Sequence, residues 1–218
     1  WRFTVAGRVD SPPTIHGELV LFGCADGCVY CLRAADGKLV WRFRAAPGMR
    51  RVAAFQQVES AWPVHGSVLL QDGVVYCSAG RSSYLDGGIS LYGLDPETGK
   101  IIHETVLESE RPDIHKESGR PFDVEGARSD ILVSDGTDIY LYQVRLNPDL
   151  TRQETPRITR LGDRKMGLHL MCTGGFLDTT WCDRMYWSYS RRWPGYYFAN
   201  NGPKVGKILV FDNENTYG

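Results

Sequence analysis

The residues whose types and spacing can support chemistry begin with three cysteines, Cys24, Cys28 and Cys31. A zinc site needs thiolates that converge on the ion at about 2.3 Å. Cys28 and Cys31 fall three residues apart on one predicted strand, so their side chains face opposite sides of the sheet, which argues against zinc. The short loop between Cys24 and Cys28 allows a disulfide across a hairpin. We therefore expect structural thiols, with a Cys24–Cys28 disulfide as the alternative and no metal.

Two segments share an aromatic-Leu-Asp core behind glycine or serine. Residues 81–88 contain Tyr84 and Asp86, and residues 174–180 contain Phe176 and Asp178. Each aspartate either caps its own turn or, if both segments occupy equivalent places in a repeated fold, lies at the same end of the molecule as the other. In the second case the pair would hold a polar ligand between them.

Residues 181–198 are rich in aromatic side chains, with arginines interleaved among them. Aromatic faces beside arginine suit a sugar, a peptide or a flat cofactor, whereas the alternative is that a β-rich core uses these rings for packing. His65 lies in another segment, 62–66, that looks like an insertion. The candidate ligand-binding residues are Trp62, His65, Arg81, Tyr84, Asp86, Asp178, Trp181, Asp183 and Arg184.

Composition narrows the classes of partner. The net charge is -1 and 23% of residues are charged, so no nucleic acid or anionic membrane surface is expected as a ligand. No apolar run is long enough to span a bilayer. The 24 glycines and 11 prolines favour many short strands joined by tight turns. No nucleophile-elbow, phosphate-loop, dinucleotide or zinc-protease motif is present, and we assign no catalytic residue.

An internal repeat in the sequence predicts the strands that hold these side chains in place. Trp1-Arg2-Phe3 recurs as Trp41-Arg42-Phe43, and residues 91–103 match residues 29–41. Each copy reads as strands separated by tight turns, which is typical of a four-stranded antiparallel sheet. One such sheet cannot bury both of its faces, so it needs neighbours on either side, as in a β-propeller.

The end of each copy identifies a family resemblance. Gly93-x-Asp95-x-x-Thr98-Gly99-x-x-x-His103 and Cys31-x-Arg33-x-x-Asp36-Gly37-x-x-x-Trp41 resemble the tryptophan-docking motif of pyrroloquinoline-quinone-repeat (PQQ-repeat) propellers. The resemblance implies that the turn glycine adopts a positive φ and that the tryptophan packs on the neighbouring blade. PQQ dehydrogenases that resemble this family carry two adjacent cysteines and bind calcium through Glu, Asn and Asp residues. This sequence has no adjacent cysteines, and none of its residues can be matched to those calcium ligands. The resemblance therefore implies a cofactor-free propeller.

The predicted fold class is all-β, a partial β-propeller of about four four-stranded antiparallel blades with loop insertions. The blades are expected at 4–46, 60–104, 126–170 and 171–218 of a single domain, with residues 1–3 as the last strand of a preceding blade. A hairpin is expected about Asp135-Gly136. The chain is interpreted as a fragment of a larger protein.

The predicted function is non-catalytic binding or scaffolding. The alternative is a quinoprotein-like or carbohydrate-acting enzyme with site residues outside this chain, and only then would PQQ with calcium be the cofactor. Expected partners are the rest of its own propeller and a protein or saccharide ligand. The resemblance implies a periplasmic or extracellular location, with the cytoplasm as the alternative.

Overall fold

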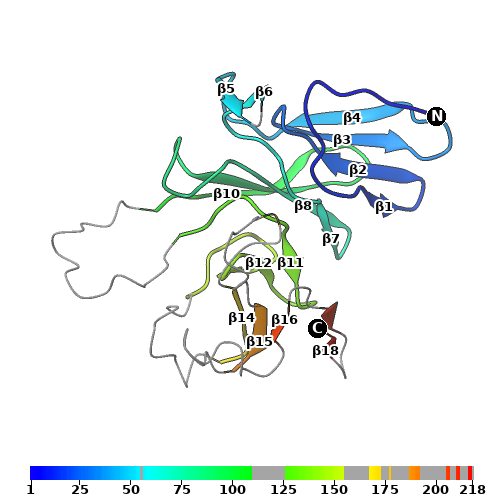
Figure 1. The fold of residues 1–218 in the computed structure, drawn as a ribbon. Coiled ribbons are helices and arrows are strands. Elements are labelled where there is room, and N and C mark those ends of the chain that lie inside the picture. The colour runs from blue at the N-terminus through cyan, green and yellow to red at the C-terminus, as the bar shows by residue number, and fades with distance from the viewer. Residues whose placement is uncertain are drawn as a thin grey trace.

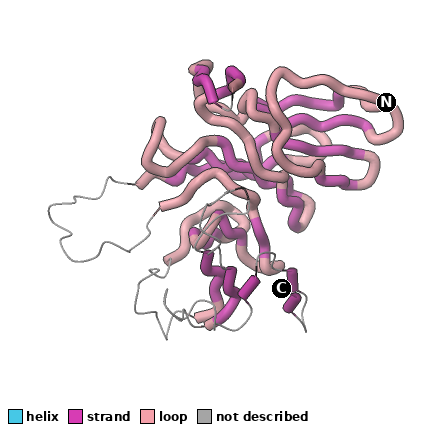
Figure 2. The backbone as a smooth tube through the Cα atoms, viewed as in Figure 1, coloured by secondary structure: helices cyan, strands magenta, loops and turns pink. Residues whose placement is uncertain are grey.

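The computed structural model describes residues 1–54, 56–109, 126–154, 167–172, 177, 187–191, 205–206, 210–211 and 216–217. All regular elements in this part are strands (Figure 2). No described helix is long and apolar enough to cross a membrane.

Two complete four-stranded antiparallel sheets form the first half of the chain (Figure 1). The first contains β1 (Thr14–His16), β2 (Leu19–Gly23), β3 (Cys28–Arg33) and β4 (Leu39–Arg44). The second contains β7 (Leu69–Gln71), β8 (Val74–Ala79), β9 (Ile89–Leu94) and β10 (Ile101–Leu107). In each sheet the strands pair in chain order, as tight turns between successive strands require.

The second half continues the pattern with shorter strands. The third sheet contains β11 (Val133–Ser134), β12 (Ile139–Leu141) and β13 (Val144–Leu146), and an isolated bridge pairs Leu146 with Arg152 at its edge. The fourth contains β14 (His169–Cys172), β15 (Trp187–Ser190) and β16 (Val205–Gly206), and β17 (Val210–Phe211) pairs with β18 (Thr216–Tyr217). The expected hairpin about Asp135-Gly136 joins β11 to β12.

Two details differ from the sequence-based division. The expected boundary at 170 cuts through β14, which pairs with β15, so the fourth sheet begins at His169. An additional hairpin, β5 (Arg51–Ala54) with β6 (Gln57–Ser60), stands between the first two blades and was not anticipated. Propensity alone did not reveal it, because its strands are short and polar and apolar residues do not alternate regularly between the buried and the exposed face.

The blades pack face to face around a shared axis. The first strands β1 and β11 both contact β7, which places the first strand of each blade innermost. Leu21, Val29 and Cys31 of the first sheet share a core with Val75 and Cys77 of the second. A separate core joins the second and third sheets. The chain is therefore an all-β, partial β-propeller, as the sequence predicted.

The tryptophan motif docks one blade on the next, as the resemblance implied. The Trp41 indole Nε1 donates a hydrogen bond to the carbonyl oxygen of Pro96 at 2.9 Å. Its ring lies on Gly99, where a Cβ would come within 2.7 Å of the ring, and Gly99 has a φ of 68°. Glycine suits this position for both reasons, because it tolerates the left-handed backbone and leaves room for the ring.

Trp1 repeats this contact one blade earlier. Its Nε1 donates to the carbonyl oxygen of Ala34 at 2.6 Å, and its ring lies on Gly37. Residues 1–3 are assigned to no strand here, and their expected role as the last strand of a preceding blade stays a prediction. The indole contact thus forms without a strand pairing beside it.

Candidate functional site

The insertions gather at one end of the propeller. Successive strands alternate in direction, so the loops between β2 and β3, β8 and β9, and consecutive blades emerge at the same end. We call this end the loop face and define it by residues 24–27, 45–68, 80–88 and 126–132. The candidate residues that it contains are Trp62, His65, Arg81, Tyr84 and Asp86.

Trp62 and Asp86 are brought into direct contact. The Trp62 Nε1 donates to the Asp86 carbonyl oxygen at 2.9 Å. Arg50 completes the cluster, since its guanidinium pairs with the Asp86 carboxylate and lies 5.4 Å from the centroid of the Trp62 ring. Arg50 thereby joins the β4–β5 connection to the β8–β9 loop. Sequence reasoning missed Arg50, although it lies in a segment that the repeat does not need.

His65 and Arg81 belong to a second cluster, a chain of charged groups centred on Glu59. His65 Nδ1 lies 2.6 Å from an Asp10 carboxylate oxygen, and Asp10 also pairs with Arg8. Arg8 lies 3.5 Å from one oxygen of Glu59, and Arg81 pairs with the other. The Glu59 side chain is only 1% exposed, so this carboxylate depends on its two arginines.

The environment of Asp10 favours its charged form. Burial opposes ionisation, but hydrogen bonds from Arg8 and His65 outweigh it and hold the pKa of Asp10 below its usual value. The same hydrogen bond is the main reason that the pKa of Arg8 is raised. Both groups therefore stay charged near neutral pH and cannot serve as proton carriers there.

Tyr84 lies at the junction of the second and third blades, where its ring packs on Gly126. Beside it, the buried Ser83 hydroxyl accepts a hydrogen bond from the Ala127 amide at 2.9 Å and one from Ser109 at 2.9 Å. These contacts are structural. They explain the conformation of the 81–88 loop without a ligand.

The remaining candidates, Asp178, Trp181, Asp183 and Arg184, lie outside the described residues. Leu177, which precedes Asp178, donates its backbone N–H to Asp130 at 3.1 Å. Asp130 in turn lies against Gly66, next to His65. Leu177, the described residue of the second aromatic-Leu-Asp segment, thus contacts the loop face.

The cysteines are confirmed on opposite faces of β3. Cys28 packs in the outer cluster of the first blade with Tyr30, whereas Cys31 is buried in the core shared with the second blade. Cys24, Cys28, Cys31 and Cys77 are free thiols in the structure. Burial raises the pKa of Cys31 to about 11 and those of Cys24 and Cys77 to about 12.

We expect these buried thiols to resist alkylation. At pH 8, a pKa of about 11 lowers the thiolate fraction roughly 100-fold relative to an ordinary cysteine, and burial limits access further. Iodoacetamide labelling followed by peptide mapping should show Cys31 and Cys77 reacting at least roughly 100-fold faster in denaturant than in the native protein. Cys28, which is half-buried, is the internal control and should react first. Rapid native labelling of Cys31 would contradict this placement.

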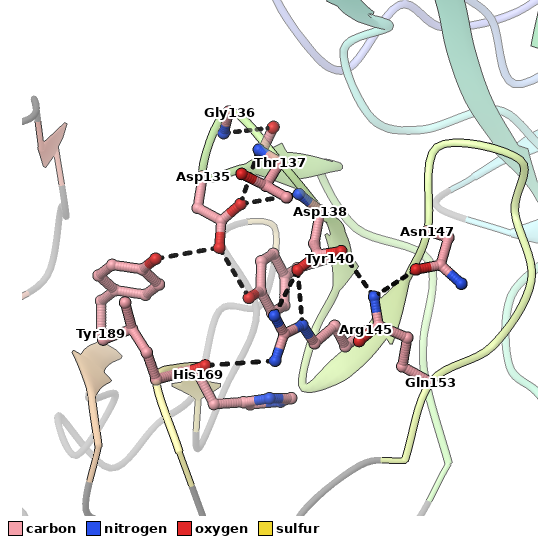
Figure 3. A network of polar contacts seen from close by, with 12 residues as sticks. Asp135, Gly136, Thr137, Asp138, Tyr140, Arg145, Asn147, Gln153, His169 and Tyr189 are labelled. Atoms are coloured by element: carbon pink, nitrogen blue, oxygen red, sulfur yellow. Dashed lines mark hydrogen bonds and ion pairs between the residues drawn. The ribbon is translucent and has the colours of Figure 1, made fainter.

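A buried polar network ties the third blade to the fourth (Figure 3). The hydroxyls of Tyr140 and Tyr189 both donate to the Asp135 carboxylate, at 2.9 and 3.0 Å. Arg145 pairs with Asp138, and His169 Nε2 lies 2.8 Å from the carbonyl oxygen of Gln143. Burial of Asp135 opposes its charge, but these hydrogen bonds and two backbone amides lower its pKa overall.

Acidification should destabilise the fold through His169. Burial lowers the pKa of this imidazole below 6.5, so the native state holds it neutral while the unfolded chain takes up a proton. Its contribution to stability is complete above about pH 6.5 and is lost as the pH falls towards the folded pKa. Urea unfolding between pH 8 and 5 should show this loss. His169→Gln, which keeps a donor for Gln143, should flatten the curve, and an unchanged slope would contradict the assignment.

The described residues do not fit PQQ with calcium. Calcium needs six to eight oxygen ligands. Across the described ranges, no group of three or more His, Cys, Asp or Glu side chains is arranged to hold a metal. Glu59 and Asp86 of the loop face, and Asp10 beside it, are instead each paired with arginine.

Several solved structures align with this chain. BamB from Moraxella catarrhalis aligns with a TM-score of 0.45 and 14% identity, covering 87% of this chain and 49% of that one. The quinohemoprotein alcohol dehydrogenase from Comamonas testosteroni aligns with a TM-score of 0.49 and 18% identity, covering 69% and 27%. A europium-containing methanol dehydrogenase aligns with a TM-score of 0.48 and 13% identity, covering 88% and 43%. This chain therefore spans about half the length, or less, of each of these three proteins.

No curated protein matches the sequence. A family model does match, over residues 1–149, and its description is outer membrane protein assembly factor BamB. The matched region includes the first three sheets, both copies of the tryptophan motif and most of the loop face. Because the match covers more than half of the chain, this protein belongs to the PQQ_2 family of PQQ-repeat propellers.

Proposed function

We propose that this chain is a non-catalytic scaffolding propeller that binds another protein through its loop face. The family description names an assembly factor, and assembly factors act by contacting other proteins. The same description supports an extracytoplasmic location for this chain, periplasmic or extracellular. Under this proposal the blades act as a rigid support, and the insertions provide the contact surface.

The observation that carries the proposal is the size of the hollow on the loop face. It has a volume of about 90 Å³ beside Glu59 and Arg51. Sites for cofactors and drug-sized ligands usually measure about 300–1,000 Å³. A tricyclic quinone or a sugar chain does not fit within this hollow, whereas a flat protein contact with a shallow notch does.

The side chains on the loop face also favour protein binding over sugar binding. Sugars stack on an open aromatic face. The Trp62 ring is instead covered by Gly48 and approached by Arg50. Met49 and Val58 beside it are 70% and 64% exposed, which is typical of apolar groups that a partner protein covers.

Two measurements test this function. A photo-crosslinking residue at Val58 should give a discrete adduct with one extracytoplasmic protein, whereas the same residue at Lys100, at the opposite end of the propeller, should not. The unmodified protein should compete for the adduct. Equal adducts from both positions, or none from Val58, would contradict a loop-face scaffold.

The second measurement addresses the enzyme alternative. The protein is incubated with PQQ and calcium, and oxidation of a primary alcohol is followed with an artificial electron acceptor. We expect no turnover above a control without protein. Turnover that requires both additions would overturn the scaffold proposal in favour of a quinoprotein.

A further inference from the structure

An arm on the loop face is held rigidly at both ends. The arm comprises residues 45–60, which connect β4 to the β5–β6 hairpin and contain it. On one side its backbone is anchored to the β2–β3 loop, since Ala46 N–H donates to Gly27 at 3.0 Å and Ser60 N–H donates to Ala25 at 2.9 Å. On the other side Arg50 pairs with Asp86. The arm is therefore a preformed surface, which lowers the entropic cost of binding.

A notch opens between the base of the arm and the end of β4. Three arginines line it, Arg44, Arg50 and Arg51, and Asp26 and Glu59 form its floor. Its volume of about 90 Å³ corresponds to a few water molecules at ~30 Å³ each. This space accommodates a carboxylate group and excludes a nucleotide or a sugar ring.

The two acidic residues that line the notch have different partners. Asp26 accepts the Cys28 N–H at 3.0 Å through one oxygen and the Tyr30 hydroxyl at 2.5 Å through the other. Glu59 is neutralised by Arg8 and Arg81 from beneath. Glu59 is thus already ion-paired, whereas Asp26 keeps its negative charge and offsets at most one of the arginines that line the notch.

Two of these arginines form no ion pair within the described part of the chain. Arg44 approaches the Met49 sulfur, and Arg51 is exposed. Both side chains are exposed, and the neighbouring Met49 and Val58 are exposed apolar groups. The notch thus combines an excess of positive charge with an apolar rim, and guanidinium groups bind carboxylates through charge-assisted hydrogen bonds.

We infer that the notch binds an acidic peptide segment of a partner protein, with a carboxylate between Arg44 and Arg51 and an adjacent apolar side chain on Met49 and Val58. This inference rests on the proposed scaffold function and specifies its contact. A free phosphate would satisfy the arginines but would leave the apolar rim uncovered. The rim therefore favours a peptide over an inorganic anion.

The test uses a short fluorescent peptide of alternating glutamate and leucine, followed by anisotropy at low ionic strength. The double variant Arg44→Gln/Arg51→Gln should weaken binding at least about tenfold, because two charge contacts are lost. The matched control Lys38→Gln/Lys100→Gln removes the same charge from turns at the opposite end of the propeller and should change affinity less than about twofold. Both exposed pairs should leave the urea midpoint unchanged.

Variants of the probe separate the ligand classes. A peptide with lysine in place of glutamate should not bind, and one with serine in place of leucine should bind more weakly. Equal binding of the leucine and serine peptides, with full displacement by inorganic phosphate, would reduce the notch to an anion site and overturn the inference. Unchanged binding by the double arginine variant would also overturn it.

Failure of the inference can be distinguished from failure of the function. If the Val58 adduct survives in the double arginine variant, the scaffold function stands and the acidic contact is wrong. If the crosslinker at Val58 gives no adduct even with Arg44 and Arg51 intact, the function itself fails. If both the adduct and peptide binding are lost together in the variant, both proposals are supported.

Discussion

Replacing Trp41 with alanine is expected to lower the free energy of unfolding by about 3 kcal/mol. The change removes the indole from its contact with Gly99 and leaves the Pro96 carbonyl without its donor. Loss of a large aromatic side chain from a packed site usually costs ~3–5 kcal/mol, and Trp41 belongs at the lower end because it is only half-buried. Equilibrium urea unfolding followed by circular dichroism measures the loss.

Trp1 provides a matched comparison at the same motif position. Trp1→Ala should cost less than half as much, because this ring is 62% exposed although it makes the same indole hydrogen bond. Trp41→Phe keeps much of the apolar contact and should fall between wild type and Trp41→Ala. Equal losses for Trp1→Ala and Trp41→Ala would show that the hydrogen bond, and not the packing, carries the docking energy.

Replacing Glu59 with alanine should cost about 2 kcal/mol. Removing one partner from a buried ion pair usually costs ~3–5 kcal/mol, because the other charge is left without compensation. Here Arg81 and Arg8 remain 23% and 27% exposed, so water relieves part of the penalty. Urea unfolding at pH 7 gives the measurement, with the same variant followed in high salt.

The double variant Glu59→Leu/Arg81→Met separates pairing from packing. It should lose less than the two single changes added together, since neither charge is then left alone. Asp36→Asn is the control, because the Arg33–Asp36 pair is exposed on a turn and should have no measurable effect on stability. Strict additivity at Glu59 and Arg81 would mean that their pairing contributes nothing to the fold.

Much of the fold could be predicted because it depends on local signals. The turn glycines and the alternation of apolar residues specify each hairpin from contacts a few residues apart. The opposite orientation of Cys28 and Cys31 follows from the two-residue period of a strand in the same way. The turn after β13, in which the Asn147 N–H donates to the Thr151 carbonyl oxygen, was not predicted, because Leu150, with a φ of 65°, adopts the left-handed backbone that usually marks a glycine.

The candidate site was predictable only in part. Trp62, Arg81 and Asp86 lie in segments that the repeat does not need, and the structure places all three on the loop face. It did not reveal their partners, because Arg50, Glu59 and the others lie up to dozens of residues away along the chain. Glu59 in particular reads as an ordinary surface residue of a short strand until its two arginines are placed around it.

By itself the sequence determined the all-β class, the repeated blades and the use of Trp41 to dock one blade on another. These features come from short-range turn chemistry and from a period that persists along the chain. Only the tertiary structure decided that the β5–β6 hairpin forms and that, among the described residues, Arg44 and Arg51 form no ion pair. Only it also showed that Arg50 is neutralised by Asp86. The physical reason is that charge pairing and burial depend on which distant loops meet at the same end of a propeller, and neither period nor propensity encodes that meeting.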